Sequence, residues 1–507
     1  MKICLINPPK VFPKNWDDKY SFHPPLGLAY IAAVLKSKGH EVIIIDAVIE
    51  DWKNIQELDE KIICIGLSFD KIGELVKKYK PDAVGIGGLT FWKKSIYETA
   101  KTIKSVIDVP IIIGGAHASA NPEECLSEKH IDYVIIGEGE ITSVELIDKL
   151  DKKQDVENVN GIGYKKDEKI ILNKQREFIN DLDSIPFPDR DLLNLEKYFE
   201  PDVLYNSDRE QAIRWIDVVS SRGCPFNCVF CSAHKITGKK WRYRSAKNVV
   251  DEIEQAVKKY NIQEVEFEDE NISLSRERMT EICDLIIERK LKIRLNSPQG
   301  MRADTLNEEI LKKMKKAGYA QITIAPETGV QRISDEVIEK RMDLKKVEEV
   351  IIASKKIGIA ISCFFVIGLP GETLEDIKKT IKYAKKLRKL GAVNCTFNNA
   401  LPIPGTRLYH ESKKNGYLLK DGKELDEHLI YNRHKHLFKT PDWNPEDIEK
   451  LYRQAIKENA RGVLFGSKYM VFYRLKRFTF GMIHAPKLTL NLTKNKITEM
   501  ISGEKDN

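Results

Sequence analysis

Short apolar runs alternate with amphipathic stretches over the first 150 residues of the chain. The runs are rich in Val and Ile, as buried β-strands are, and the stretches between them have the apolar spacing of helices. Continuous apolar strands separated by helices are typical of a parallel sheet that is covered on both faces. The pattern therefore predicts a Rossmann-like α/β domain over 1–150, with strands at 1–9, 41–47, 62–68, 81–90, 109–117 and 132–140 and helices at 25–40, 94–106, 122–130 and 141–150.

Glycines stand where the later strands of this domain end. They form three sets on successive strands, namely Gly87 and Gly88, Gly114 and Gly115, and Gly137 and Gly139. A single pair is an ordinary turn, but three sets favour a flat or bulky ligand that needs close approach of the backbone. Ligands of open parallel sheets bind beyond the carboxyl ends of the strands. No GxGxxG follows the first strand, so a dinucleotide is disfavoured.

The strand–helix alternation stops at residue 151 and resumes near residue 206. The stretch 151–205 is polar and contains prolines, which predicts a connector. About six strand–helix repeats follow up to residue 420, and this number fits a partial (β/α)6 barrel of the TIM type. From 421 to 507 we expect a helical region without new strands.

One segment of the C-terminal region, residues 467–483, has an unusual composition. It mixes aromatic side chains with four cations, Lys468, Arg474, Lys476 and Arg477. Two interpretations stay open: a helix that packs with its charges in solvent, or a basic aromatic surface that meets a membrane or a lipid-like substrate. The second interpretation is the one reason to lean toward a lipid-like substrate.

The composition is that of a cytoplasmic globular protein with several domains. The chain has 507 residues, of which 42% are hydrophobic and 31% charged. Its net charge of +7 is spread along the sequence, which argues against a dedicated nucleic-acid binder. The N-terminus has no basic region followed by an apolar one, and no window approaches the roughly 20 apolar residues that span a bilayer. Because the cytoplasm keeps thiols reduced, clustered cysteines favour a metal over a disulfide.

Three of the nine cysteines, Cys224, Cys228 and Cys231, stand together in SRGCPFNCVFCSA (221–233). A structural zinc site takes four ligands in paired knuckles; His234 is available as a fourth, but no second knuckle is present. Ferredoxin-type clusters use four cysteines, and no fourth one is near. Three thiolates on one loop suit three corners of a [4Fe–4S] cluster, with one iron left open. The remaining cysteines read as small buried hydrophobic residues, namely Cys4, Cys64, Cys125, Cys283, Cys363 and Cys395.

This loop, with the aromatic Phe230 before its last cysteine, resembles the signature of the radical S-adenosylmethionine (SAM) superfamily. The resemblance implies that the open iron chelates the amino and carboxylate groups of SAM. Reduction of the cluster then cleaves SAM to a 5′-deoxyadenosyl radical. The loop follows the first strand of the predicted barrel, at the end where such barrels hold active sites.

Further stretches resemble the cobalamin-associated branch of this superfamily, among them KWRYRSAKNVVDEI (240–253) and PIPGT (402–406). FEDENIS (267–273) is similar to its acidic motif, which implies that Glu268, Asp269 and Glu270 lie near SAM. IAPETG (324–329) resembles its ESG-type motif, so Glu327 is expected to face SAM. Pro326 and Thr328 differ from the residues that are commoner in this motif. Phe230 and Gly368, the latter in IGLPGET (367–373), are expected to contact the cofactor as well.

The N-terminal domain resembles the cobalamin-binding domain that precedes such barrels. The similar stretches are NPP (7–9), HPPLGLAYIAAVLKSKGHEV (23–42), GGAHASANPEE (114–124) and DYVIIGEGE (132–140). No DxHxxG is present, which implies cobalamin bound without a histidine ligand; for His117 a turn or packing role is favoured. Trp92 and the preceding two residues are expected to line the lower face of the corrin. The full set of expected cobalamin contacts is Thr90, Phe91, Gly114, Gly115, Gly137 and Glu138.

The resemblance implies a cobalamin-dependent methyltransferase. One SAM methylates cobalamin, and a second gives the radical that takes hydrogen from an unactivated carbon, which then receives the methyl group. No side chain is assigned as a general acid or base, because the cofactors carry the chemistry. The expected partner is a one-electron reductant such as ferredoxin or flavodoxin; we expect no specific nucleic acid and at most peripheral membrane contact.

Three alternatives stay open from the sequence. A non-methylating member of the branch performs cyclisation, ring contraction or oxidation. A methylthiotransferase needs a second three-cysteine cluster in the N-terminal domain; Cys4, Cys64 and Cys125 are available but lack its sequence context. A cobalamin or redox sensor uses the same domains for binding only.

Overall fold

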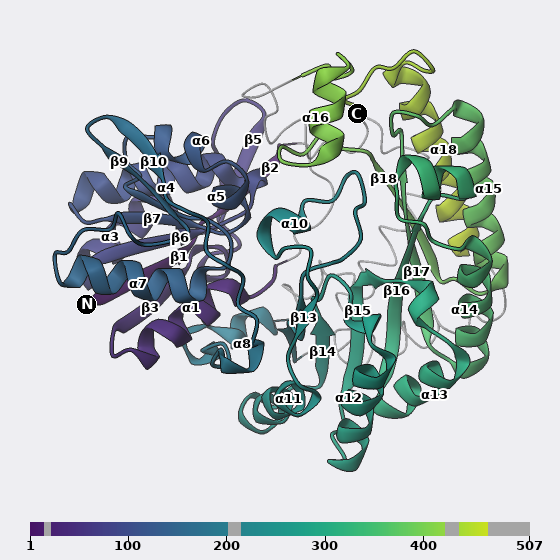
Figure 1. Ribbon diagram of the computed structural model, residues 1–507, viewed down its shortest axis with the longest axis horizontal. Helices are drawn as coiled ribbons and strands as arrows, with labels where there is room; N and C mark the ends of the chain where they lie inside the picture. Colours follow the sequence, from purple (N-terminus) through teal and green to yellow (C-terminus); the bar gives the residue numbers. More distant parts are fainter. Residues whose placement is uncertain (15–21, 201–213, 421–434, 465–507) are drawn as a thin grey trace.

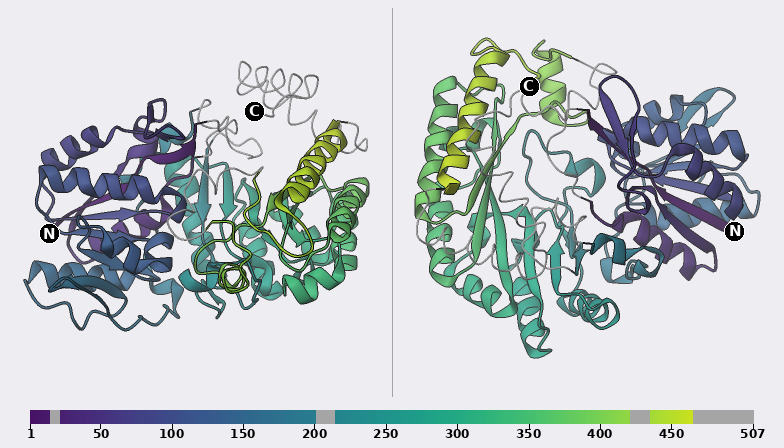
Figure 2. Two further views of the ribbon diagram at one scale, coloured as in Figure 1. Left: turned by 90° about the horizontal axis from the view of Figure 1, so that it is seen from above. Right: turned by 180° about the vertical axis from the view of Figure 1, so that it is seen from behind.

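The computed structural model describes residues 1–14, 22–200, 214–420 and 435–464. The described chain forms two lobes side by side, an N-terminal lobe and a larger lobe built on a second sheet (Figures 1 and 2). The short helix α10 (Ala233–Ile236) lies between them (Figure 1). The α/β fold predicted from the hydrophobic pattern is confirmed.

The N-terminal lobe contains a seven-stranded sheet in the order β10-β9-β8-β7-β6-β1-β3. Its parallel part is formed by β1 (Lys2–Asn7), β3 (Glu41–Asp46), β6 (Ala83–Gly87), β7 (Ile111–Gly114) and β8 (Tyr133–Ile135). Apolar side chains of α3 (Phe69–Tyr79) and α4 (Lys93–Val106) pack on one face. Those of α1 (Leu26–Ser37) and α7 (Gly139–Asp151) pack on the other. Both faces of the sheet are therefore covered, as the apolar strands require.

Two features of this lobe differ from the predicted pattern. The strand expected at 62–68 exists as β5 (Ile62–Ile65), but it pairs antiparallel with β2 (Lys10–Pro13) and β4 (Ile55–Glu57) in a separate sheet. The expected connector contains a hairpin, β9 (Ile162–Lys166) and β10 (Lys169–Leu172), which extends the main sheet past residue 150. Pairing partners are not encoded in the local pattern, and the hairpin is too polar to stand out from it.

The second lobe contains six parallel strands in the order β11-β14-β15-β16-β17-β18. They are β11 (Trp215–Val218), β14 (Glu264–Phe267), β15 (Arg294–Met301), β16 (Tyr319–Glu327), β17 (Ala360–Ile367) and β18 (Asn394–Asn399). The helices between them cover the outer face, namely α11 (Ala246–Tyr260), α12 (Arg276–Glu288), α13 (Glu308–Ala317), α14 (Leu344–Ile357) and α15 (Leu374–Leu390) (Figure 1). In the described residues the sheet stays open between β11 and β18, so this is the predicted partial barrel.

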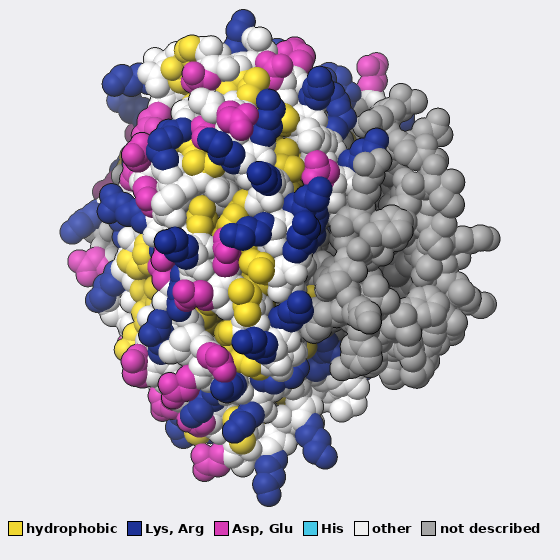
Figure 3. Space-filling model, turned by 90° about the vertical axis from the view of Figure 1, so that its right-hand side faces the viewer, with side chains coloured by type: hydrophobic (Ala, Val, Ile, Leu, Met, Phe, Trp, Pro, Cys, Tyr) yellow, Lys and Arg dark blue, Asp and Glu magenta, His cyan; other side chains and the backbone are white. Residues whose placement is uncertain are grey.

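The described part of the C-terminal region is helical. Following α16 (Arg407–Lys414), α18 (Pro445–Leu464) packs against β18 and α15. Lys and Arg side chains are interspersed with Asp and Glu over this outer side of the lobe (Figure 3). The basic aromatic segment 467–483 lies outside the described residues. Within the described part of the chain, no helix has the length and apolar character needed to cross a membrane.

Candidate active site

The cysteine loop connects the two strands of a small ribbon that follows β11. The ribbon pairs β12 (Ser221–Arg222) with β13 (Arg242–Tyr243), and residues 223–241 form the loop between the two strands. The backbone N–H of Cys224 donates to the carbonyl of Gly238 at 3.2 Å, which closes the loop above the ribbon. Gly223 has a φ of +86°, and a Cβ there would lie 2.3 Å from the carbonyl oxygen of Lys240, so the turn requires glycine.

The three thiols of the loop are free and partly buried. Burial raises the pKa of Cys228 to about 12 and raises the pKa values of Cys224 and Cys231 as well. The ammonium group of Lys340 acts in the opposite direction on each of them. Because burial disfavours the ionised form of these thiols, a bound metal centre would stabilise them as thiolates.

The geometry of the loop favours a cluster over a single zinc ion. Tetrahedral zinc with Zn–S bonds of about 2.3 Å brings its ligand atoms to within roughly 4 Å of one another. In the described part of the chain, one group of His, Cys, Asp and Glu side chains has its ligand atoms within 4.8 Å of one another. This group contains no cysteine. His234 is also occupied, since its Nε2 lies 3.0 Å from the carbonyl oxygen of Cys224. Among the described residues the three thiols therefore do not gather with a fourth ligand into such a group, which fits three corners of a [4Fe–4S] cluster.

Two of the predicted acids lie beside these cysteines. The carboxylate of Glu270 interacts electrostatically with Cys224 and Cys231 and accepts a hydrogen bond from the Thr237 hydroxyl at 2.6 Å. Burial raises the pKa of Glu270 above its usual value. Glu327 stands at the end of β16 and interacts electrostatically with Cys228. Its Oε1 accepts a bond of 2.7 Å from Lys340 Nζ, so a paired carboxylate and ammonium flank the loop.

The other predicted contacts on the barrel side have different neighbours. Asp269 is buried and accepts from the Ser220 N–H at 3.1 Å, from the Ser220 hydroxyl at 2.8 Å and from the Ser221 hydroxyl. Its carboxylate therefore fixes the chain just after β11. Glu268 accepts a hydrogen bond from the side chain of Gln299. That Asp269 and Glu268 contact SAM stays a prediction.

Gly368 and Phe230 occupy packed positions. Gly368 follows β17 with a φ of +79°, and a Cβ there would lie 2.4 Å from Cε1 of His436. The glycine thus leaves room for a buried histidine of the C-terminal region. Phe230 packs partly buried against the barrel core. Their expected contacts with SAM stay predictions.

In the N-terminal lobe, the strand-end glycines come together at one edge of the sheet. The N–H of Gly88 donates to the carbonyl of Gly114 at 3.4 Å, and a Cβ on Gly115 would lie 3.0 Å from the carbonyl oxygen of Gly88. The N–H of Gly137 donates to Ser119 Oγ at 2.9 Å. A Cβ on Gly114 would meet no atom within 4 Å. The space directly beside this strand end is therefore open.

This edge faces the cysteine loop. The helix α5 (Ala116–Ala120) starts at the strand-end glycines and contacts α10 of the cysteine loop. On the barrel side, a Cβ on Gly405 of PIPGT would lie 3.9 Å from Cβ of Ala120. The half-buried residues Thr90, Phe91 and Trp92 form the turn η1 (Thr90–Trp92) after β6, at the same edge. These positions fit a cobalamin on the N-terminal lobe that faces the cluster.

His117 points into the lobe. It is fully buried, and its Nε2 lies 2.7 Å from the hydroxyl oxygen of Tyr97. Burial lowers the pKa of His117 to about 4. These contacts agree with the packing role favoured from the sequence.

Glu138 has contacts that the sequence analysis missed. It is buried between Arg222 and Arg242, two arginines of the ribbon that carries the cysteine loop. Its expected contact with the corrin stays a prediction, while the structure assigns its carboxylate to an ion pair between the lobes. The only local signal is the presence of arginines on both sides of the cysteines.

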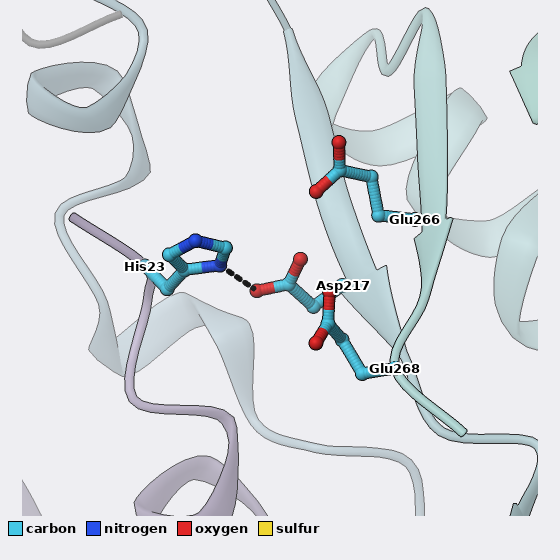
Figure 4. A group of neighbouring side chains, drawn as sticks. All are labelled: His23, Asp217, Glu266 and Glu268. Atoms are coloured by element: carbon cyan, nitrogen blue, oxygen red, sulfur yellow. Dashed lines mark hydrogen bonds and ion pairs between the residues drawn. The ribbon is translucent and has the colours of Figure 1, made fainter. Parts of the chain in front are cut away.

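A second polar group, of which the sequence analysis named only Glu268, lies where the inner face of the barrel sheet meets the N-terminal lobe (Figure 4). It comprises His23, Asp217, Glu266 and Glu268, whose ligand atoms lie within 4.8 Å of one another. His23 precedes α1, and its Nδ1 lies 3.3 Å from Oδ2 of Asp217 on β11. Glu266 belongs to the neighbouring strand β14, in register with Asp217. Such a group offers charged and hydrogen-bonding contacts within the barrel.

Family models match both lobes. Residues 218–384 match the model of the Radical SAM superfamily, and residues 19–147 match that of the B12 binding domain. An uncharacterized methyltransferase of Pyrococcus horikoshii is 34% identical, over 85% of this chain and 86% of that protein. The cytidylyl-2-hydroxyethylphosphonate methyltransferase of Streptomyces wedmorensis is 30% identical, over 91% of this chain and 90% of that protein.

Two further proteins are similar. The anaerobic magnesium-protoporphyrin IX monomethyl ester cyclase of Rubrivivax gelatinosus is 30% identical, over 71% of this chain and 62% of that protein. Among solved structures, the radical SAM methyltransferase TsrM of Kitasatospora setae, with tryptophan and a SAM analogue bound, superposes with a TM-score of 0.68. It is 17% identical and covers 90% of each chain, which shows that the fold is shared.

Proposed function

The chain belongs to the cobalamin-binding radical SAM enzymes, and we propose that it transfers a methyl group from SAM to an unactivated carbon of its substrate. Its cofactors are a [4Fe–4S] cluster, SAM and cobalamin. When bound, the cluster and SAM supply a 5′-deoxyadenosyl radical, and cobalamin supplies a transferable methyl group. The chain itself binds these groups, orients them and excludes water.

The observation that supports the proposal is the contact between α5, at the strand ends of the N-terminal lobe, and α10 of the cysteine loop. The open space beside Gly114 and the cysteine loop lie at the contact between α5 and α10. A substrate held there meets a radical source on one side and a methyl donor on the other. Cys224, Cys228 and Cys231 would hold the cluster, while Glu270 and Glu327 would bind the amino group of SAM.

We further infer that the substrate is polar. Along β11 and β14, Ile216, Val218, Val265 and Phe267 pack into the core, so the alternate residues Asp217 and Glu266 face inward. The same alternation on the remaining strands turns inward Asn296, Gln321, Thr323, Ser362, Thr396 and Asn398, together with the apolar Phe364 and Val366. The side chain of Asn394 accepts a hydrogen bond from Asn459 of α18. This lining favours a substrate with hydrogen-bond donors or a positive charge over the lipid-like molecule suggested by residues 467–483.

The test uses methyl-deuterated SAM and extracts of the source cells. The anaerobically reconstituted enzyme is incubated with reductant and with two fractions, one retained by a cation exchanger and one extracted into chloroform. We expect a product that is three mass units heavier than its unlabelled counterpart, from the polar fraction. Label that enters only the chloroform fraction would contradict the proposed substrate class. Formation of 5′-deoxyadenosine with no labelled product in any fraction would contradict methyl transfer.

A radical cyclase without methyl transfer is the second candidate. It is supported by the similarity to the Rubrivivax cyclase over 71% of this chain. The same experiment separates the two, because a cyclase product forms at the expense of SAM without gaining deuterium.

The methylthiotransferase alternative is disfavoured by the positions of the N-terminal cysteines. Cys4 lies in β1, Cys64 in β5 and Cys125 in α6 (Pro122–Ser127), and all three are fully buried. Three separated and buried thiols do not form the second cluster that this reaction needs.

A further inference from the structure

Four charged side chains connect the two lobes at the base of the cysteine loop. Glu138 and Glu140 stand after β8, at the start of α7, and Arg222 and Arg242 stand on the ribbon β12–β13. Arg222 donates to Glu138 Oε1 at 3.2 Å and also to Glu140. Arg242 Nη1 donates to Oε2 of Glu138 at 2.9 Å. We call these four residues the interlobe ion-pair group.

The group is buried and has further hydrogen bonds. The side chains of Glu138 and Arg242 are 6% and 2% exposed. Glu138 Oε2 also accepts from the N–H of Ile179 at 2.7 Å, and Arg242 also donates to the carbonyls of Ile179 at 2.6 Å and Thr237 at 2.7 Å. A buried pair with this many bonds has one geometry, and removal of one partner leaves an uncompensated charge. An exposed pair would have neither property.

The interlobe ion-pair group lies next to both the cysteine loop and the strand-end glycines. Arg222 and Arg242 are opposite each other in the ribbon, and all three cluster cysteines lie in the loop between them. Arg222 is two residues before Cys224 in the sequence. On the other lobe, Glu138 directly follows Gly137, one of the strand-end glycines. A shift of one lobe against the other therefore changes the position of the cluster ligands relative to the strand ends.

We propose that the interlobe ion-pair group sets the position of the cluster relative to the cobalamin-binding edge. Its members are positioning residues, and Glu138 acts through Arg222 and Arg242 rather than by touching the corrin. The inference rests on the proposed function, because methyl transfer requires both cofactors to reach one substrate atom. A loosened group still allows SAM cleavage, but the substrate radical then meets the methyl donor less often.

The test compares the wild-type holoenzyme with Glu138→Gln, which keeps the shape of the side chain and removes its charge. Glu145→Gln is the matched control, because Glu145 lies on the same helix α7 and pairs with Arg176 instead of the ribbon. Pulsed electron paramagnetic resonance measures the dipolar coupling between the reduced cluster and cob(II)alamin. The second readout is the ratio of methylated product to 5′-deoxyadenosine.

We expect Glu138→Gln to keep the iron, sulfide and cobalamin content of the wild type but to broaden the distribution of dipolar couplings. Its product ratio should fall by roughly 10- to 100-fold, the effect of a misplacement of about 1 Å. Glu145→Gln should match the wild type in both readouts. If Glu138→Gln does not fold, Arg222→Lys is measured in the same way. This variant keeps the positive charge but loses the paired N–H donors of the guanidinium.

Two results would overturn the inference. One is a wild-type coupling and product ratio in the folded variant. The other is loss of cobalamin from Glu138→Gln with normal iron content, which would make Glu138 a direct cofactor contact. The dipolar coupling needs only the bound cofactors. A failure of the proposed methyl transfer would therefore show in the wild-type product analysis and leave the coupling readout intact.

Discussion

Replacement of Gly114 by leucine tests whether the open space at the strand ends is the corrin site. Gly114 ends β7, and a Cβ there would meet no atom within 4 Å. The larger side chain should therefore change the free energy of unfolding of the cobalamin-free protein by no more than about 0.5 kcal/mol. At Gly88, by contrast, a Cβ would lie 2.6 Å from Cδ1 of Ile96, so the same replacement should destabilise the fold.

With cobalamin present, the added leucine occupies space that the corrin needs. Overpacking of this kind costs about 1 to 3 kcal/mol, which corresponds to a dissociation constant for cobalamin raised roughly 5- to 150-fold. Equilibrium dialysis with hydroxocobalamin measures this constant, and Gly114→Ala should give a smaller increase. Thermal unfolding without cobalamin and the iron content provide the controls. A normally folded Gly114→Leu protein that binds cobalamin with wild-type affinity would refute the assignment of this edge.

Three further outcomes are expected. Cys224→Ser should lose the cluster iron and keep cobalamin binding, whereas Cys283→Ser, in the buried core, should keep its iron; equal iron in both would contradict the ligand assignment. Lys340→Met should lower the midpoint potential of the cluster, on the order of tens of millivolts, because a cation near the thiols favours the reduced state; a redox titration that shows a rise would refute this. Burial raises the pKa of Glu372 to about 8, so its stabilising contribution is full below its ordinary value of 4.5 and is lost as the pH rises toward 8. Glu372→Gln should therefore have a higher free energy of unfolding than the wild type, by up to about 3 kcal/mol at pH 7 and by less at pH 5. Thermal unfolding at the two pH values measures this difference, and a difference that does not depend on pH would contradict the shifted pKa.

Local patterns were enough to predict the architecture and the cluster loop. The Val- and Ile-rich runs predicted the parallel strands, because a strand buried on both faces must be apolar throughout. The spacing of Cys224, Cys228 and Cys231 predicted the cluster, because the three ligands lie within one loop. Signals of this kind depend on residues that are close in the sequence.

Contacts between distant segments were not predictable in the same way. The group around His23 joins residues 194 positions apart, and Glu138 meets Arg222 across 84 positions. Glu138 was correctly placed at a strand end, but its partners come from the other lobe. The pairing of β5 shows the same limit, since its fully buried residues read identically in either sheet. The sequence determines these contacts only through the complete fold.

The most direct test of the central claim needs no knowledge of the substrate. The protein is purified without oxygen, loaded with cobalamin and incubated with a one-electron reductant and methyl-deuterated SAM. Mass spectrometry then follows the deuterated methyl group on cobalamin, together with 5′-deoxyadenosine in the same sample. If the protein is a cobalamin-dependent methyltransferase, both signals should appear. The methyl signal should be lost without cobalamin, and 5′-deoxyadenosine should be lost without the cluster. Release of 5′-deoxyadenosine with no deuterium on cobalamin would contradict the account.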